Sequence, residues 1–242
     1  PSDLSFLTRP DLGPPGTRRI NMVRLGHALT ELDDPPIKCL HVYLSNPAAV
    51  APQSKAVMAG LARPDLFVSV QEMFMTDTAR MADIILPGAS FLEVNDLYRA
   101  YGHNYLQLAA PVIPPVGRSR STLSIFQGLA RRMGFGEDVF SLSERQCVDR
   151  MLADPSAAMD GLDLDRLRSG RPVHLNIPDD PYTESFQTPS GKIEFFSEDG
   201  AGRGLDPLPD GQPIRDPEGG KRFPLAFITP PHRLFLNSAF NE

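Results

Sequence analysis

The residues that point most directly to chemistry are four polar side chains between two short apolar runs: Glu72, Thr76, Asp77 and Thr78. A carboxylate at a strand's carboxyl end can accept hydrogen bonds from ribose hydroxyls or from the edge of a guanine base. Glu72 is equally explained as a solvated loop acid. Asp77 and Thr78 can cap a helix that begins near Ala79, so both threonines are ambiguous between helix cap and ligand group.

These side chains need an α/β unit to position them. The β-branched run from Leu66 to Val70 predicts a buried strand that ends just before Glu72. Residues 82–86 predict a second buried strand, because proline cannot continue a ladder and Pro87 follows.

A third strand is expected over residues 38–44, followed by a turn at Asn46 and a helix over residues 53–61. Such a βαβ unit has an almost invariably right-handed crossover. Asn46 and Glu72 are then expected at neighbouring strand ends, facing one crevice. Asn-Pro is also an ordinary turn-forming pair, which leaves a purely structural role for Asn46 open. No glycine fingerprint follows these strands, which argues against an ordinary dinucleotide-binding Rossmann site.

Several motifs, in a fixed order over about residues 18–242, resemble the molybdopterin oxidoreductase family, whose members include dimethyl sulfoxide reductase, formate dehydrogenase and nitrate reductase. The order of the motifs is more specific than any one of them. The motifs are Leu44-Ser-Asn-Pro47, Glu72-Met-Phe-Met-Thr-Asp-Thr-Ala79, Ala82-Asp-Ile-Ile-Leu-Pro87 with Glu93, Tyr101-Gly-His-Asn-Tyr-Leu-Gln107, Thr188-Pro-Ser-Gly-Lys-Ile-Glu-Phe195 and Phe223-Pro-Leu-Ala-Phe-Ile-Thr-Pro230.

The resemblance implies binding of the guanine dinucleotide part of a molybdopterin cofactor, in an enzyme that holds molybdenum or tungsten between two such cofactors. The parent enzyme is then expected to carry out two-electron redox chemistry or oxygen-atom transfer on a small-molecule substrate, with an electron-transfer subunit as a partner. Glu72 stands where relatives often have Asp. The resemblance and the turn chemistry together nominate as cofactor-binding residues Asn46, Glu72, Thr76, Asp77, Thr78, Arg233 and Asn237.

The number and spacing of the cysteines indicate neither a metal ligand nor an iron–sulfur centre. The chain has only Cys39 and Cys147, without Cys-x-x-Cys spacing, and Cys39 is expected to be a buried small apolar residue. Any iron–sulfur cluster would belong to a preceding segment. Since the sequence starts without Met and ends where the family's C-terminal domain would begin, we expect a piece of a longer oxidoreductase that is inactive alone.

The composition of the chain argues against some classes of binding partner. The net charge of −6 disfavours a nucleic-acid surface, and no apolar run approaches the roughly 20 residues of a membrane span. Two cysteines without a disulfide framework favour the cytoplasm, although a piece would have lost any export signal. A solvated face is the expected role of Arg118, Arg120, Arg131 and Arg132.

The fold class expected is α/β, with a Rossmann-like three-layer αβα unit of parallel strands, then helices and an irregular Pro/Gly-rich segment. The expected divisions are 1–36 (lead-in and helix), 37–150 (nucleotide-binding unit with following helices), 151–222 (irregular segment with a strand at 193–196 and a linker from 199) and 223–242 (start of a C-terminal dinucleotide-binding β-barrel domain, with its first strand at 223–229).

His103 lies among Tyr98, Tyr101 and Tyr105, where it could move protons beside a substrate funnel. A lone histidine among aromatic side chains is more often a packed, hydrogen-bonded residue. Two alternatives to the cofactor-binding hypothesis remain open: a cofactor-free homologue that acts as a structural subunit of a redox complex, and an independent nucleotide-binding module.

Overall fold

The computed structural model describes residues 17–136, 138–153, 157–178, 186, 188–208, 225, 230, 233 and 238. The chain forms two compact units, one comprising Pro1–Asn176 with Asn237–Glu242 and the other Ile177–Leu236, and each is considered by itself. Within the described part, every helix is too short or too polar to cross a membrane.

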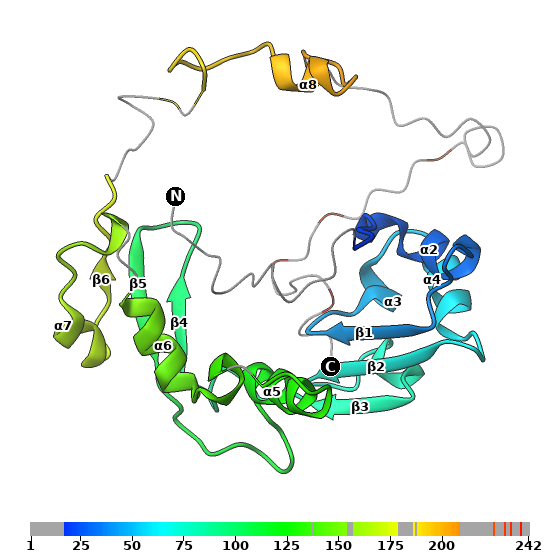
Figure 1. Cartoon of the computed structure of the whole chain (residues 1–242), viewed down its shortest axis with the longest axis horizontal. Helices are drawn as coiled ribbons and strands as arrows, with labels where there is room; N and C mark the ends of the chain where they lie inside the picture. Colours follow the sequence, from blue (N-terminus) through cyan, green and yellow to red (C-terminus); the bar gives the residue numbers. More distant parts are fainter. Residues whose placement is uncertain are drawn as a thin grey trace. The chain divides into compact units, whose positions relative to one another are not determined.

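A three-stranded parallel sheet forms the centre of the first unit (Figure 1). Its strands lie in the order β1 (Cys39–Tyr43), β2 (Phe67–Glu72) and β3 (Ile84–Pro87). The register pairs Tyr43 with Gln71, and Glu72 with Pro87. The carboxyl ends of the three strands therefore lie together and form the carboxyl edge of the sheet. The expectation of parallel strands in these three segments is confirmed.

One face of the sheet packs against α2 (Leu25–Glu31) and α4 (Ser54–Leu61). The two helices approach closely because Gly60 has no side chain: a Cβ there would lie 2.4 Å from Leu29 Cβ. The apolar core on this face consists of Leu29, Val42, Ala48, Val57, Leu61, Leu66, Val68, Val70 and Ala79. Each fully buried Val or Leu contributes about 1.5–3 kcal/mol, so this core is the main source of stability described in the unit.

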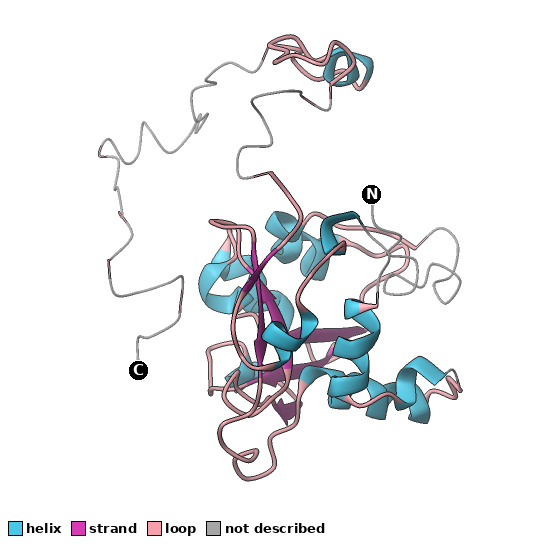
Figure 2. Ribbon diagram, turned by 90° about the vertical axis from the view of Figure 1, so that its left-hand side faces the viewer, coloured by secondary structure: helices cyan, strands magenta, loops and turns pink. Residues whose placement is uncertain are grey.

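The other face of β1 and β2 contacts α5 (Thr122–Arg132). His41 and Tyr43 both meet Phe126 edge to face at 5.5 Å, and Gln71 Nε2 donates to Thr122 Oγ1 at 2.7 Å. The sheet therefore has helices on both faces, and Figure 2 shows strands of this unit with helices around them. The Ser121 side chain caps α5 by accepting from the Ser124 N–H.

Two sequence expectations about burial were wrong. Ile84 and Ile85 are 47% and 37% exposed, although this strand was expected to be buried. The reason is that β3 is an edge strand of the described sheet. Cys39 is exposed rather than buried, because it is the first residue of β1 and lies at the amino end of the strand.

A second sheet is antiparallel, in the order β4 (Asp96–Arg99), β5 (Tyr105–Ala109) and β6 (Val173–His174). The contacts of β4 include α6 (Glu144–Leu152), which begins with a capping box between Ser143 and Gln146, and those of β5 include α7 (Leu164–Arg168). The remaining short helices of this unit are η1 (Met22–Arg24), α3 (Pro47–Val50), η2 (Ala79–Met81), η3 (Asp138–Ser141) and η4 (Ala157–Met159).

In the second unit, residues 193–196 do not form the expected strand. Ile193 and Phe195 are 62% and 82% exposed, and no described strand pairs with them. The expected linker from residue 199 instead begins inside a short helix, α8 (Glu198–Gly202), which the Ser197 side chain caps. The strand expected at 223–229 lies outside the described residues, apart from Leu225.

A single carboxylate organises the loops between β3 and α5. Glu93 Oε1 accepts from the N–H and hydroxyl of Ser90, at 3.2 and 2.8 Å. Glu93 Oε2 accepts from Val116 N at 3.0 Å and from Ser119 Oγ at 2.7 Å. These bonds, led by the one from Val116, lower the pKa of Glu93 to about 2.

We expect Glu93 to make stability depend on pH. Because its pKa is about 2 in the folded chain against 4.5 ordinarily, its contribution is present above pH 4.5 and is lost as pH falls towards 2. Glu93→Gln should therefore be less stable than wild type above pH 4.5, and the difference in unfolding free energy should shrink below it. Urea unfolding from pH 6 to 3 measures this difference, and a constant gap would contradict the role of Glu93.

Gly60→Ala should destabilise the chain by about 1–3 kcal/mol, because the added methyl overlaps Leu29 Cβ and the helices must move apart. Gly128→Ala in α5 is the matched control, since its Cβ would meet only Arg132 Nη1, at 3.8 Å. Alanine's better helix propensity should leave this control neutral or stabilised by up to about 1 kcal/mol. Urea unfolding compares the two, and an equal effect would contradict close packing of α2 on α4.

Candidate functional site

The candidate site begins where β1 ends. Leu44 has a φ of +49°, in the left-handed region that side chains other than glycine rarely adopt. Its N–H still donates to Gln71 O at 3.0 Å, so the strained residue makes the last backbone hydrogen bond from the β1 segment to β2. Strain of this kind costs about 1–2 kcal/mol and is concentrated at functional turns.

Asn46 follows and joins two turns through its side-chain oxygen. The N–H and hydroxyl of Thr78 donate to Asn46 Oδ1 at 3.1 and 2.8 Å. The Thr78 hydroxyl accepts in turn from Ala48 N at 3.0 Å. Asn46 is 8% exposed and Thr78 is fully buried. The turn after β1 is therefore fixed to the turn after β2 by bonds that water does not compete for.

The side-chain nitrogen of Asn46 is engaged much more weakly. Its Nδ2 lies 3.5 Å from Asp77 Oδ2 and 3.4 Å from Ser238 Oγ. Both distances exceed the usual N–H···O range of about 2.7–3.2 Å. Asp77 itself is exposed. An amide with two weakly used donors and an exposed carboxylate therefore stand side by side at the edge of the sheet.

The helix predicted near Ala79 is a single 3-10 turn, and its cap differs from the expected one. Thr76 Oγ1 accepts from Ala79 N at 3.2 Å, whereas neither Asp77 nor Thr78 caps it. The Thr78 hydroxyl instead donates to Asn46 Oδ1 and accepts from Ala48 N. Thr76 is thus a cap, and Thr78 positions Asn46.

Glu72 is the last residue of β2 and is half-buried. Its Oε1 accepts from the Met73 N–H at 2.8 Å, and no hydrogen bond links it to the Asn46 network in the described part of the chain. It lies at the same sheet edge, paired in register with Pro87. Glu72 thus shares the edge with Asn46 and keeps an acceptor oxygen for a ligand.

The other nominated residues do not join this cluster. His103 is exposed, precedes β5 in the antiparallel sheet, and accepts from Tyr105 N through Nδ1 at 3.1 Å. Its ring also meets the Tyr105 ring at 5.7 Å. These are the local contacts of an exposed turn residue. Arg233 is exposed and belongs to the second unit, and Asn237 lies outside the described residues.

Sequence reasoning missed the polar residues on the α5 face of the sheet. Gln71 is fully buried, and its Oε1 has no hydrogen-bond partner among the described residues. His41 Nδ1 lies 3.2 Å from Ser69 Oγ, and burial lowers the pKa of His41. The available signal was the presence of His, Ser and Gln at alternate positions of otherwise apolar strands.

The polar groups at this edge suit an organic ligand that carries both donors and acceptors, such as a nucleoside. Neither cysteine suits a metal-ligand role here: Cys39 lies at the opposite end of β1, and burial raises the pKa of Cys147 in α6. Within the described part, His, Cys, Asp and Glu do not gather in groups of three that could hold a metal ion.

Comparison with known proteins matches residues 23–132 to the family described as Molybdopterin oxidoreductase. The chain is 38% identical, over 98% of its length, to the "Probable oxidoreductase YoaE" of Bacillus subtilis, of which it covers 34%. It is 28% identical, over 83% of its length, to the assimilatory nitrate reductase catalytic subunit of the same organism, covering 28% of that protein.

Among solved structures, acetylene hydratase from Pelobacter acetylenicus aligns with a TM-score of 0.65 and 26% identity, over 85% of this chain and 28% of that one. The mixed α/β architecture, with its parallel sheet and small antiparallel sheet, thus corresponds to a portion of that fold. The chain spans about a third or less of the length of the curated relatives cited here.

Thr78→Val should lower the free energy of unfolding by about 1–3 kcal/mol, because the buried Ala48 N–H loses its acceptor and Asn46 loses a donor. Thr78→Ser keeps the hydroxyl and should lose less. Thr30→Val is a matched control on the surface of α2, where the hydroxyl donates only to Gly26 O. Urea unfolding ranks the three, and an equal effect of all would contradict the bridging role of Thr78.

Proposed function

Because this chain belongs to the molybdopterin oxidoreductase family, we propose that it binds the guanine dinucleotide part of a molybdopterin cofactor at the carboxyl edge of its parallel sheet. The observation that carries this proposal is the Asn46 amide. Its oxygen is held rigidly by Thr78, while its nitrogen has only long contacts and so offers donors in a fixed position.

The charges at this edge suggest which part of the nucleotide they meet. Asp77 and Glu72 are acceptors, so they suit the N–H groups of a guanine edge or the hydroxyls of ribose. They would repel a diphosphate at close range. Asn46 Nδ2 can donate to a base or sugar oxygen beside them. Thr78 has no free donor and acts by orienting Asn46.

When bound, the cofactor would supply the molybdenum or tungsten at which two-electron redox chemistry or oxygen-atom transfer takes place. The share of this chain is to bind and orient the cofactor's nucleotide end. One relative is named as a nitrate reductase subunit and another as a hydratase, so these strands do not choose the reaction. A small-molecule substrate and an electron-transfer subunit complete the proposal for the whole protein.

A cofactor-free homologue is the second candidate, and one observation favours it. Asn46 Oδ1 already accepts two hydrogen bonds from Thr78, so the residue has a structural use without any ligand. Against it stands the exposed acceptor of Asp77 beside an under-used amide donor, an arrangement that packing alone does not require.

Asp77→Asn and Glu72→Gln, made in the natural protein that contains this sequence, should each reduce the retained cofactor. Losing a charged acceptor is expected to weaken nucleotide binding by about 1–3 kcal/mol. The measurement is molybdenum and tungsten by mass spectrometry, with extracted guanine nucleotide per protein, after expression with molybdate and tungstate.

The matched control is Asp165→Asn, because the Asp165 side chain is 99% exposed on α7. It should leave cofactor content unchanged. Full nucleotide content in both site variants would remove the two carboxylates from the site. A wild-type protein without metal or guanine nucleotide would instead support the cofactor-free homologue.

A further inference from the structure

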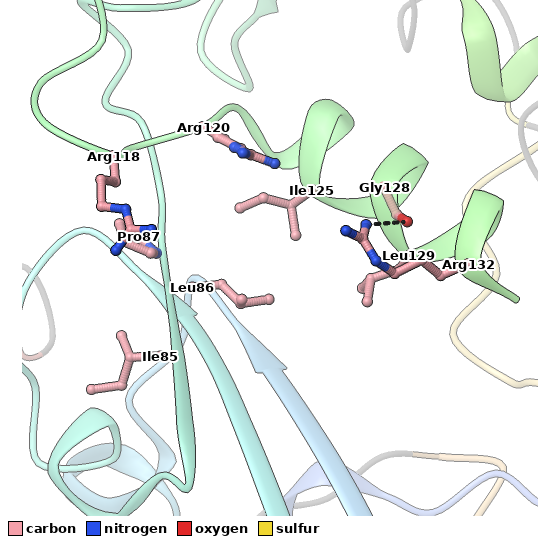
Figure 3. A pocket seen from close by; sticks show the side chains of 9 residues that line it. All are labelled: Ile85, Leu86, Pro87, Arg118, Arg120, Ile125, Gly128, Leu129 and Arg132. Carbon is pink, nitrogen blue, oxygen red and sulfur yellow. Dashed lines mark hydrogen bonds between the residues drawn. The ribbon is translucent and has the colours of Figure 1, made fainter.

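A basic pocket lies between the edge strand β3 and helix α5 (Figure 3). Its volume is about 530 Å³. The apolar part of the wall is formed by Ile85, Leu86, Pro87, Ile125 and Leu129. The cationic part is formed by Arg118 and Arg120, from the loop before α5, and by Arg132 at the end of α5. Gly128 of α5 also lines the pocket. The nine lining residues include no acid.

The loop that carries two of the arginines is held in place by its backbone. Arg120 N donates to Pro87 O at 3.0 Å, and Arg120 O accepts from Ala89 N at 2.8 Å. Ser119, between the two arginines, donates its hydroxyl to Glu93 at 2.7 Å. Gly117 makes the preceding turn with a φ of +61°. The side chains of Arg118 and Arg120 therefore extend from a segment whose backbone is held in place by hydrogen bonds.

Within the residues that the structure describes, the three guanidinium groups make few hydrogen bonds. Arg132 Nη1 donates to Gly128 O at 3.2 Å, one of the several N–H groups that an arginine carries. Among the described residues, no ion pair links Arg118, Arg120 or Arg132 to an acid. Glu93, the acid that organises this loop, is fully used by Ser90, Val116 and Ser119. All three arginine side chains are exposed, and in the described part of this chain, whose net charge is −6, none of them is paired with an acid.

We propose that this pocket binds a small organic anion, one whose carboxylate or phosphate meets the arginines while its apolar body rests on β3 and α5. Arginine forks match the oxygens of both anions. The volume falls within the range of about 300–1,000 Å³ found for small-molecule sites, which are mostly apolar with a few placed polar groups. The pocket does not include the residues of the proposed nucleotide site, although its Pro87 pairs in register with Glu72.

The test uses the full chain and three probes: phenyl phosphate, phenol and inorganic phosphate. Phenyl phosphate should bind, seen as shifts of α5 and loop 116–120 amide signals in ¹H–¹⁵N spectra, and more tightly than either probe that lacks one of its two parts. Its affinity should fall as salt is added. In Arg118→Gln/Arg132→Gln, the affinity should fall by about tenfold or more.

Arg131→Gln is the matched control, since Arg131 is the neighbour of Arg132 on α5 and does not line the pocket. It should keep wild-type affinity, and thermal unfolding checks that each variant is folded. Equal weakening by Arg131→Gln would overturn the proposal in favour of unspecific charge. Equal binding of phenol and phenyl phosphate would reduce the pocket to an apolar slot.

Two other outcomes would also overturn it. Binding of a polyglutamate peptide without binding of phenyl phosphate would assign the arginines to an acidic protein segment. Loss of guanine nucleotide from the natural protein on Arg118→Gln/Arg132→Gln would make the pocket part of the nucleotide site. Retained nucleotide, together with lost phenyl phosphate binding, is the expected combination.

Discussion

The hydrogen bonds between Thr78 and Asn46 are the constraint on which the site depends. They connect the turn after β1 with the turn after β2, two segments that the sheet itself does not bond to one another. Because both partners are buried, opening this bridge would leave polar groups without partners and without water. Leu44, with its left-handed φ of +49°, lies two residues before Asn46, where these bonds help to hold the strained conformation in place.

The sheet divides the unit into two chemically different halves. Val42, Val68 and Val70 face a core of aliphatic side chains, while His41, Ser69 and Gln71 face α5. An apolar face gives stability without directional demands. A polar face requires partners at defined positions, and the buried Gln71 Oε1 has none in the described part. The α5 side is therefore the half of the unit in which buried polar atoms are incompletely satisfied among the described residues.

Much of this arrangement was predictable, because periodicity reports burial. The three parallel strands and the helix at 54–61 follow from their apolar patterns and end signals. The edge exposure of β3 was not predictable, since an apolar run looks alike at the centre and at the edge of a sheet. The sequence left Thr76 and Thr78 ambiguous between helix cap and ligand group, because the deciding contact of Thr78 is non-local: its hydroxyl donates to Asn46, 32 residues before it. The antiparallel strands were missed because they are short: β4, β5 and β6 have four, five and two residues.

The carboxyl edge of the sheet carries opposite charges on its two sides, and this bears on how both sites function. Asp77 stands beside Asn46, on the side of the sheet where Ala48 and Ala79 pack into the core. The arginines lie on the other side, between β3 and α5. No described ion pair joins the two sets, although Glu72 and Pro87 are neighbours in register. The arrangement is therefore best explained if each set meets a ligand of its own, with hydrogen-bond donors facing the acids and an oxyanion facing the arginines.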